Sequence, residues 1–417
     1  MARRIEGGDN VSTETDAGSA SRGSSVAEVF LVFLRLGLTS FGGPVAHLGY
    51  FREEFVTRRR WLDENAYAHL VALCQFLPGP ASSQVGMAVG LSRAGYAGAF
   101  AAWVAFTLPS AIALVLFAYG VATLGDATGS AWLHGLKIAA VAVVAQAVLG
   151  MMRTLAPDKE RATLAVVAAI IVLAIPTAWG QVAAIALGGL AGLTMLRGVA
   201  VSPDHVTMPL SVGRTAGTLS LLLFLALLVG LPMLAAETDN KSIDLIDSFY
   251  RSGSLVFGGG HVVLPLLQAE VVPPGWVSND QFLAGYGAAQ AVPGPLFTFA
   301  AYLGAMIGGW SIAALCLVTV FAPSFLLVVG TLPFWEDLRR HAWAQSLLRG
   351  VNAAVVGLLL AALYNPVWTA GIRGSKDFAL AMAAFLALYM WNVTPWLVVV
   401  LCAVAAGGLA MLSTGLA

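Results

Sequence analysis

Residues 33–44 of this 417-residue chain read FLRLGLTSFGGP, and residues 249–260 read FYRSGSLVFGGG. Each stretch places one arginine, Arg35 or Arg251, six residues before a Phe-Gly-Gly sequence. The two phenylalanines, Phe41 and Phe257, stand 216 residues apart, as do the two arginines. This repetition predicts a duplicated membrane unit, because internal repeats with interrupted helices are the usual construction of secondary transporters.

The composition of the chain supports the same class. Hydrophobic residues make up 59% of the sequence and charged residues only 11%, whereas soluble domains carry roughly 25% charged residues. Apolar runs of about 20 residues, long enough to cross a lipid bilayer, recur along the chain. The sequence therefore predicts an all-α, multi-pass (polytopic) membrane protein.

Several other classes of protein are excluded by charge and motif. The formal net charge is zero, so bulk charge indicates no nucleic-acid partner. The three cysteines stand alone in apolar segments, without metal-ligand or redox spacing. No nucleotide-binding loop or activated nucleophile is recognisable, so we expect no enzyme activity, no cofactor and no metal.

The chain divides into four parts. Residues 1–25 are polar and lack the apolar core of a signal peptide, and we expect a disordered tail. Residues 26–197 form the first repeat and residues 245–413 the second. Between them, residues 198–244 are expected to be a linker that contains one extra transmembrane helix.

The alignment of the two repeats extends well beyond the opening stretches. Trp61 and the proline motif 78–80 recur as Trp276 and the motif 293–295, with the same spacing. A glutamine precedes each motif by three residues, and the second copy adds a polar Asn352 in a later apolar segment. With Phe41, Phe257 and Asn352, the motif residues are further candidates for contact with a substrate, although for the two proline motifs a role in shaping the fold is favoured. These motif residues are Gln75, Pro78, Gly79, Pro80, Gln290, Pro293, Gly294 and Pro295.

The loops between the repeated motifs predict that the copies are inverted. The loop 51–61 contains four arginines, whereas its counterpart 268–276 contains none. Because positively charged loops stay in the cytoplasm, the first loop is expected inside and the second outside. Segments 26–48 and 66–92 are interrupted by Gly-Gly-Pro and Pro-Gly-Pro, and the charge distribution favours re-entrant segments over full crossings there.

Arg35 and Arg251 are the leading candidates for a binding role. An arginine inside the membrane costs at least about 2.5–3.5 kcal/mol on insertion scales, so it needs a compensating function or partner. One interpretation is a pair of guanidinium groups that bind an anion through two hydrogen bonds each. The other is structural pairing with Glu28, Asp244 or Asp247, one or two helical turns earlier.

The glycine-rich interruptions provide a second kind of anion contact. Gly42, Gly43 and Pro44 in the first copy, and Gly258, Gly259 and Gly260 in the second, would unwind a helix and expose amide N–H groups. The N-terminus of a helix that begins there would present donors and a positive dipole to an anion. The alternative is that these glycines only allow close helix packing. Four residues are candidates for proton coupling: His47, Glu53, Glu54 and His261.

At residues 41–47 (FGGPVAH), 60–61 (RW), 76–80 (FLPGP) and 292–295 (VPGP), the chain resembles the chromate transporter family of chromate ion exporters. The resemblance runs from about residue 26 to 365 and covers two copies of the family's domain, which is the long bacterial form. It implies chromate as the substrate, with sulfate as a competitor, and resistance to chromate as the outcome of export. The second copy departs from the pattern, since Gly260 replaces Pro44 and its loop lacks arginines.

The expected function is therefore secondary export of a tetrahedral oxyanion across the bacterial cytoplasmic (inner) membrane. Membrane potential alone is a sufficient driving force, because a dianion leaving a negative cytoplasm moves energetically downhill. Ion coupling, an anion channel, a transporter of sulfate or another oxyanion, and a membrane-embedded enzyme are the alternatives. A homodimer is among the assemblies compatible with this class.

Overall fold

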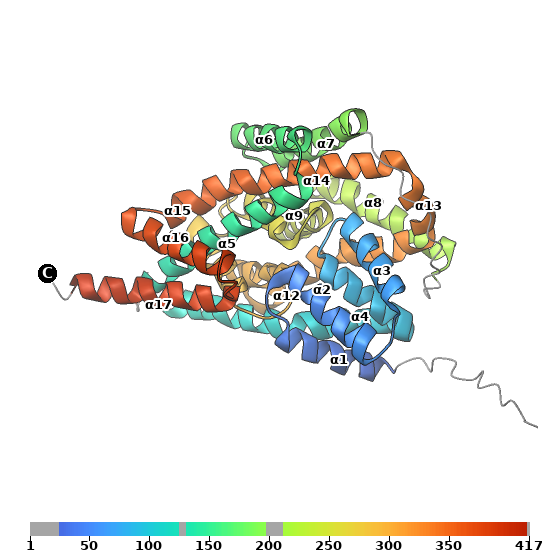
Figure 1. Cartoon of the computed structure of the whole chain (residues 1–417), viewed down its shortest axis with the longest axis horizontal. Coiled ribbons are helices and arrows are strands. Elements are labelled where there is room, and N and C mark those ends of the chain that lie inside the picture. Colours follow the sequence, from blue (N-terminus) through green and yellow to red (C-terminus); the bar gives the residue numbers. More distant parts are fainter. Residues whose placement is uncertain (1–24, 125–130, 197–211, 415–417) are drawn as a thin grey trace, which may run out of the picture.

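The computed structural model describes residues 25–124, 131–196 and 212–414. The predicted tail at 1–25, except Ser25, and most of the polar linker lie outside these residues. All regular elements in the described residues are helices (Figure 1). This confirms the predicted all-α polytopic class, since six of the helices are long and apolar enough to cross a membrane.

In the described residues, the first copy contains seven α-helices. A helix–break–helix unit opens it, and a second break precedes the very long α4. The helices are α1 (Val26–Thr39), α2 (Gly43–Arg52), α3 (Glu64–Phe76), α4 (Ala81–Leu124), α5 (Ala131–Leu155), α6 (Lys159–Ala174) and α7 (Ala178–Met195), with a π-helical turn η1 (Glu53–Arg58) after α2.

One further helix, α8 (Arg214–Glu237), precedes the second copy, which repeats the order of elements in the first. Its helices are α9 (Lys241–Leu255), α10 (Val263–Val271), α11 (Asn279–Ala289), α12 (Phe299–Thr331), α13 (Trp335–Arg340), α14 (Ala342–Ala362), α15 (Thr369–Gly371), α16 (Ser375–Tyr389) and α17 (Pro395–Thr414). The short elements are η2 (Gly260–Val262), η3 (Leu296–Thr298), η4 (Leu332–Phe334) and η5 (Leu363–Trp368).

The sequence breaks interrupt the helices where glycine and proline predict it. Three residues separate α1 from α2, and four residues separate α3 from α4. The helices stop there because Gly42, Gly43 and Gly79 adopt positive φ angles that other residues rarely tolerate. Proline also removes a backbone donor at each break. A helix of 14 residues such as α1 is about 21 Å long, shorter than the hydrocarbon core of about 30 Å.

Two long helices bend at equivalent places. In α4 the bend lies at Ala94 and Gly95, where Gly95 has φ 64° and ψ −156°. In α12 it lies at Gly308 and Gly309, where Gly309 has φ 78° and ψ −159°.

The two copies exchange their last helices. Helices α6 and α7 of the first copy pack against α14 of the second, whereas α16 and α17 of the second pack against α5 of the first (Figure 1). The long helices α4 and α12 also pack against each other. The core is therefore shared between the copies, and each copy needs the other to cover its apolar surface.

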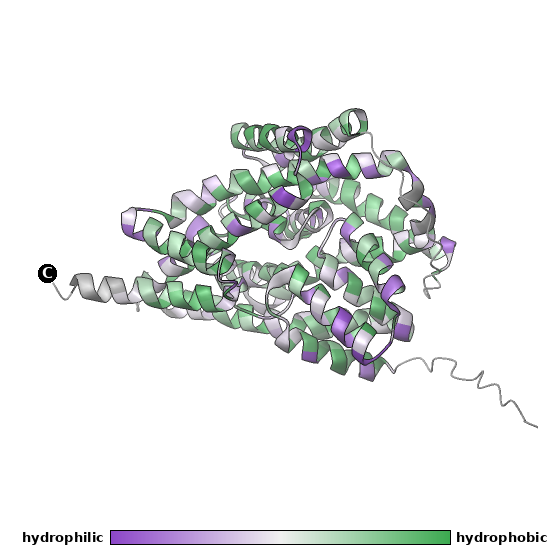
Figure 2. Ribbon diagram, in the orientation of Figure 1, coloured by the Kyte–Doolittle hydropathy of each residue, from purple (hydrophilic) through white to green (hydrophobic). Residues whose placement is uncertain are grey.

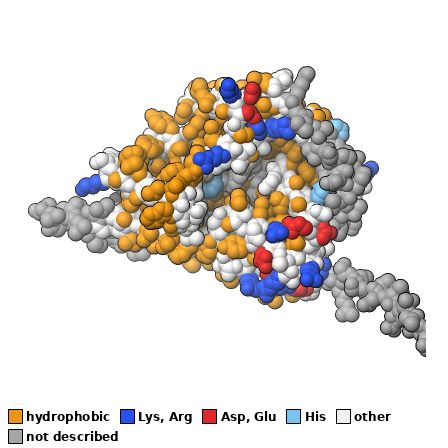
Figure 3. Space-filling view, viewed as in Figure 1, with side chains coloured by type: hydrophobic (Ala, Val, Ile, Leu, Met, Phe, Trp, Pro, Cys, Tyr) orange, Lys and Arg blue, Asp and Glu red, His pale blue; other side chains and the backbone are white. Residues whose placement is uncertain are grey.

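The outer surface is largely apolar. Green, hydrophobic residues dominate most helices (Figure 2), and apolar side chains cover much of the face in Figure 3. Leu219, Leu222, Val229 and Met233 of α8 are all more than half exposed. Charged side chains gather mainly at the end formed by α1–α3 and along a strip near α6 (Figure 3). The bilayer covers such an apolar surface in a membrane protein. Inversion of the copies relative to the membrane stays a prediction.

Candidate functional site

The breaks of the two copies meet at a cavity of about 440 Å³. The first copy contributes its Phe-Gly-Gly-Pro break, and the second contributes its Pro-Gly-Pro break together with the start of η3. Helix α5 and the turn between α16 and α17 complete the wall. Its lining includes the predicted residues Phe41, Gly42, Gly43, Pro44, His261, Gln290 and Gly294.

Two backbone hydrogen bonds connect the breaks across the copies. The amide of Gly294 donates to the carbonyl of Ser40 at 2.9 Å, and the amide of Gly79 donates to the carbonyl of Val256 at 2.6 Å. Ser40 and Val256 are equivalent positions, each directly before the repeated phenylalanine. Each Pro-Gly-Pro motif thus fixes the glycine-rich break of the other copy. Both donating glycines have positive φ angles, which only glycine adopts without strain.

Helix α2 begins at this cavity. Its N-cap, Gly42, is left-handed (φ 99°) and supplies no side-chain cap. Gly42, Gly43, Pro44 and Ala46, the residues of the cap and first turn, all line the cavity. The first amide N–H groups of a helix have no partner within the helix, and they carry the positive end of its dipole. Pro44 has no N–H, so Gly42 and Gly43 are the lining residues of α2 whose amides remain available as donors, and no cationic side chain is among the described lining residues.

The polar side chains of the cavity are neutral or weakly basic. Gln290 has a buried Nε2 with no hydrogen-bond partner among the described residues. His261 Nδ1 lies 2.8 Å from the hydroxyl of Tyr286. Gln146 donates to the carbonyl of Leu388 at 3.3 Å. No arginine, lysine, aspartate or glutamate is among the described lining residues.

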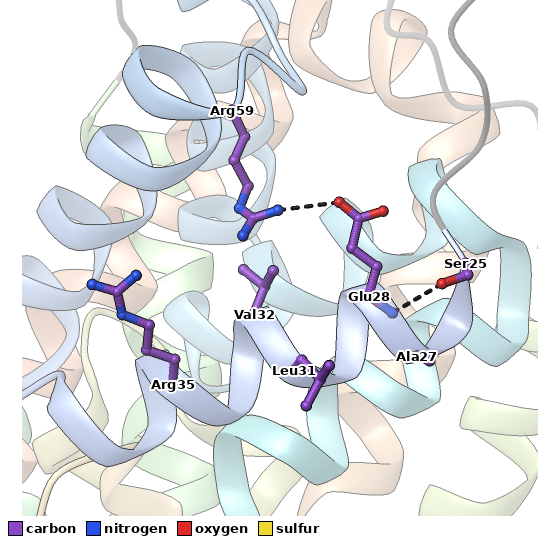
Figure 4. Close-up of a pocket in the computed structure, with 7 residues that line it drawn as sticks. All are labelled: Ser25, Ala27, Glu28, Leu31, Val32, Arg35 and Arg59. Atoms are coloured by element: carbon purple, nitrogen blue, oxygen red, sulfur yellow. Dashed lines mark hydrogen bonds and ion pairs between the residues drawn. The ribbon is translucent and has the colours of Figure 1, made fainter.

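Arg35 lies apart from this cavity. It is exposed on α1 and lines a second hollow of about 380 Å³ with Glu28, Val32 and Arg59 (Figure 4). Glu28 accepts from Arg59 at 3.1 Å, whereas no described carboxylate lies within ion-pair distance of Arg35. The structure therefore does not place Arg35 beside the Gly-Gly-Pro cavity.

Arg251 has acidic partners in the second copy. Its Nη2 lies 2.9 Å from Asp247 Oδ2 and 2.9 Å from Glu270 Oε2. Its guanidinium also lies 5.6 Å from the ring centre of Trp179. Pairing with Asp247 is one of the interpretations open from the sequence, whereas Glu270 is a partner that the sequence analysis missed.

The remaining candidates for proton coupling differ in their surroundings. His47 is buried, with its ring nitrogens 3.3 Å from Ser82 Oγ and 3.2 Å from the carbonyl of Ser40. Glu53 is exposed. Glu54 is buried and accepts from Arg59 at 2.6 Å and from Arg58 at 3.0 Å. Burial alone would raise the pKa of Glu54, but these two arginines outweigh it and hold the pKa below its ordinary value.

Other predicted residues surround the breaks without lining the cavity. Gly260 lies against Pro44, so that the two glycine-rich breaks touch, and Asn352 lies beside Gly258. Gln75 is exposed on α3. The residues that shape the breaks but are not among the lining are Pro78, Gly79, Pro80, Phe257, Gly258, Gly259, Gly260, Pro293 and Pro295.

Some lining residues carry no motif that would identify them. Asn392 and Thr394 come from the α16–α17 turn, and Gln146 comes from the middle of α5. Gln146 could have been found as a polar residue in an apolar segment, whereas Asn392 is brought in only by the exchange of helices between copies. In the described part of the chain, no group of three or more His, Cys, Asp or Glu side chains could hold a metal.

Comparison with known proteins gives consistent matches. A family model described as "Chromate transporter" matches residues 27–193 and again residues 243–407. A chromate transport protein of Pseudomonas aeruginosa is 28% identical over 401 residues, which cover 94% of each chain. A probable chromate transport protein of Synechococcus elongatus and a chromate transport protein of Cupriavidus metallidurans are each 26% identical over 357 residues, which cover 81% of this chain and 84% and 82% of theirs. No solved structure matches.

Proposed function

The chain belongs to the chromate transporter family, and on that premise we propose that it exports chromate across the bacterial cytoplasmic membrane and so confers resistance. Its relatives are named as chromate transport proteins. In the described residues, six helices are long and apolar enough to span a bilayer, which supports a multi-pass membrane protein. Sulfate, which shares the tetrahedral shape and double negative charge of chromate, is the expected competitor.

The observation that carries the proposal is the cavity at which α2 begins. An oxyanion accepts hydrogen bonds through all its oxygen atoms, so its site needs donors and must exclude carboxylates. The amides at the start of α2 and the unpartnered Nε2 of Gln290 are such donors, and no described acidic side chain lines the wall. Irregular backbone inside a membrane is tolerated where protein or a water-filled cavity covers it.

We assign three roles to the motif residues. Those that line the cavity (Phe41, Gly42, Gly43, Pro44, Gln290 and Gly294) contact the anion. The residues of the adjacent breaks shape and support that site: Gln75, Pro78, Gly79, Pro80, Phe257, Gly258, Gly259, Gly260, Pro293, Pro295 and Asn352. Arg35 and Arg251 lie outside the cavity of this conformation: Arg35 provides exposed positive charge on the route of the anion, and Arg251 does so once its carboxylate partners, Asp247 and Glu270, release it.

Flux in sealed proteoliposomes tests the proposal. The purified protein should move radiolabelled chromate, and excess sulfate should compete. Gln290→Leu removes a cavity donor and should reduce flux about tenfold, since removing a hydrogen bond to a charged group costs about 1.5 kcal/mol. Gln268→Leu on α10, outside the cavity, is the matched control and should retain wild-type flux.

The same assay separates the alternatives. A channel would show far more ions per protein per second than a transporter and would saturate poorly with substrate. Flux of sulfate without flux of chromate would reassign the substrate. Absence of any flux, with the protein folded and inserted, would contradict the proposal.

A further inference from the structure

Arg251 is shared by two carboxylates through a single nitrogen. Asp247 on α9 and Glu270 on α10 both contact Nη2, each at 2.9 Å. The three side chains are only 14%, 9% and 10% exposed for Arg251, Asp247 and Glu270. The Nε of Arg251 is buried without a partner, so neither carboxylate forms the two-pronged contact that best neutralises charge.

This cluster carries one carboxylate more than its cation can balance. The two carboxylate oxygens lie within about 6 Å of each other, because both contact the same nitrogen. Two ionised carboxylates at that separation repel each other, and removal from water raises the cost further. Such a pair is stabilised when one of its two carboxylates is protonated.

Among the described residues, no second cation forms an ion pair with Asp247 or Glu270. Asp244, one turn earlier on α9, adds further negative charge near Asp247. Helices α7 and α12, which pack against α10 and α9, carry no Asp, Glu, Lys or Arg. The other packed helices carry Arg349 on α14, Asp280 on α11, and Arg214 and Glu237 at the two ends of α8.

The glutamate at the equivalent position of the first copy has different cationic partners. Glu270 stands 216 residues after Glu54, the same separation as Arg35 and Arg251. Glu54 receives hydrogen bonds from two arginines, Arg58 and Arg59. The arginine-free loop of the second copy cannot supply two arginines to Glu270, whose partners are instead the single Arg251 and the neutral side chain of Ser248. The deficit of positive charge is therefore specific to the second copy.

The cluster also lies close in the chain to the cavity, so that a change in its charge can alter the position of residues that line the cavity. It connects α9 and α10, the two short helices on either side of the Gly258–Gly260 break. His261, two residues before α10, lines the cavity and lies next to that break. Loss of the contact between Arg251 and Glu270 would release α10 from α9 at this hinge.

We propose that Asp247, Arg251 and Glu270 form a proton-binding site whose occupancy is linked to anion transport. The proposal rests on the proposed transport function and deepens it. A proton from water binds a carboxylate oxygen of the pair, which weakens the hold on Arg251, and it leaves again later in the cycle. The coupling residues are then Asp247 and Glu270 rather than the histidines and glutamates that the sequence indicates.

Proton movement in proteoliposomes tests this inference. A trapped pH-sensitive dye reports protons while labelled chromate reports the anion, at a fixed membrane potential. Wild-type protein should move protons in step with chromate. Glu270→Gln and Asp247→Asn should each lower the protons moved per chromate at least tenfold, and chromate flux should lose its dependence on pH. Glu64→Gln, which removes an exposed ion pair with Arg52 in the first copy, should change neither.

The outcomes distinguish this inference from the transport function itself. Chromate flux without proton movement in the wild type would overturn the inference and leave the transport function intact. Unchanged proton-to-chromate ratios in both variants would also overturn it. Should Glu270→Gln fail to elute as a monodisperse species, Asp247→Asn and the pH profile of wild-type chromate flux decide the matter. No flux of either species in the wild type would contradict the proposed function instead.

Discussion

Arg35 and Arg251 show how equivalent residues acquire different surroundings in a duplicated chain. Arg251 is surrounded by Asp247, Glu270 and Trp179, whereas Arg35 is exposed beside the Glu28–Arg59 pair. Equivalence in sequence therefore does not make the two guanidinium groups a symmetric pair in this conformation. Arg35 has no acidic partner among the described residues, and its helix carries exposed Leu31 and Leu38. Placing an arginine in such an apolar setting costs free energy, which a functional role would explain.

We expect Arg35→Ala and Arg251→Ala each to reduce chromate flux at least tenfold while leaving membrane insertion largely intact. The reason is that Arg35→Ala removes exposed positive charge on the route of the anion, whereas Arg251→Ala leaves the carboxylates of Asp247 and Glu270 without their cation. Lysine should restore little of the flux in either place, because an ammonium lacks the planar fork of donors. Flux in proteoliposomes, normalised to monodisperse protein, is the measurement. Wild-type flux by both well-inserted alanine variants would make these arginines structural.

At the scale of elements, the breaks were predictable and the exchange of helices was not. Gly42, Gly43 and Gly79 interrupt their helices because of local backbone preferences that sequence alone reveals. The packing of α16 and α17 on α5 depends on long-range complementarity, which has no local pattern. As a result, Phe41 and Gln290 could be proposed from motifs, whereas Asn392 and Thr394 enter the cavity only through that packing.

The turn η1 gives a test at this scale. Glu54 connects η1 to α1 through Arg59 and Glu28, and its pKa is held below the ordinary value of 4.5 mainly by hydrogen bonds from Arg59 and Arg58 that outweigh burial. A lowered pKa means that this stabilisation is fully present above the ordinary value and is lost as the pH falls from there through the lower pKa of the folded protein. We expect Glu54→Gln to lower the free energy of unfolding at pH 7 by about 1–3 kcal/mol.

Thermal unfolding of the purified protein in detergent measures this effect. The difference in Tm between wild type and Glu54→Gln should shrink as the pH is lowered below 4.5, because Glu54 of the unfolded chain then takes up a proton while the folded protein still keeps it ionised. Glu53→Gln, which changes the exposed neighbour, is the matched control and should leave Tm nearly unchanged at both pH values. A difference in Tm that is independent of pH would rule out the ionic contribution.

At the scale of the whole molecule, the orientation of the copies remains to be measured. The loop at 51–61 carries four arginines and its counterpart carries none, so the copies are expected to face opposite sides of the membrane. Thr57 and Ser278, in or next to the two loops, are both exposed, and the three native cysteines are all buried. A membrane-impermeant maleimide applied from outside should therefore modify Ser278→Cys and not Thr57→Cys in intact cells. Labelling of both from the same side would contradict the inversion.

The energetics of the whole transport cycle lead to the last prediction. Moving one charge through 100 mV is worth about 2.3 kcal/mol, so a dianion leaving a negative interior gains about 4.6 kcal/mol, or roughly a 2,000-fold outward gradient. If one proton moves with each chromate, the pair still carries a net negative charge, and the membrane potential drives that charge outward without a pH gradient. We therefore expect a valinomycin-set potential, with equal pH on both sides, to drive chromate out of the negative compartment. Vesicles without the potential are the control. Chromate export that requires a pH gradient even at full potential would show that the potential is not sufficient.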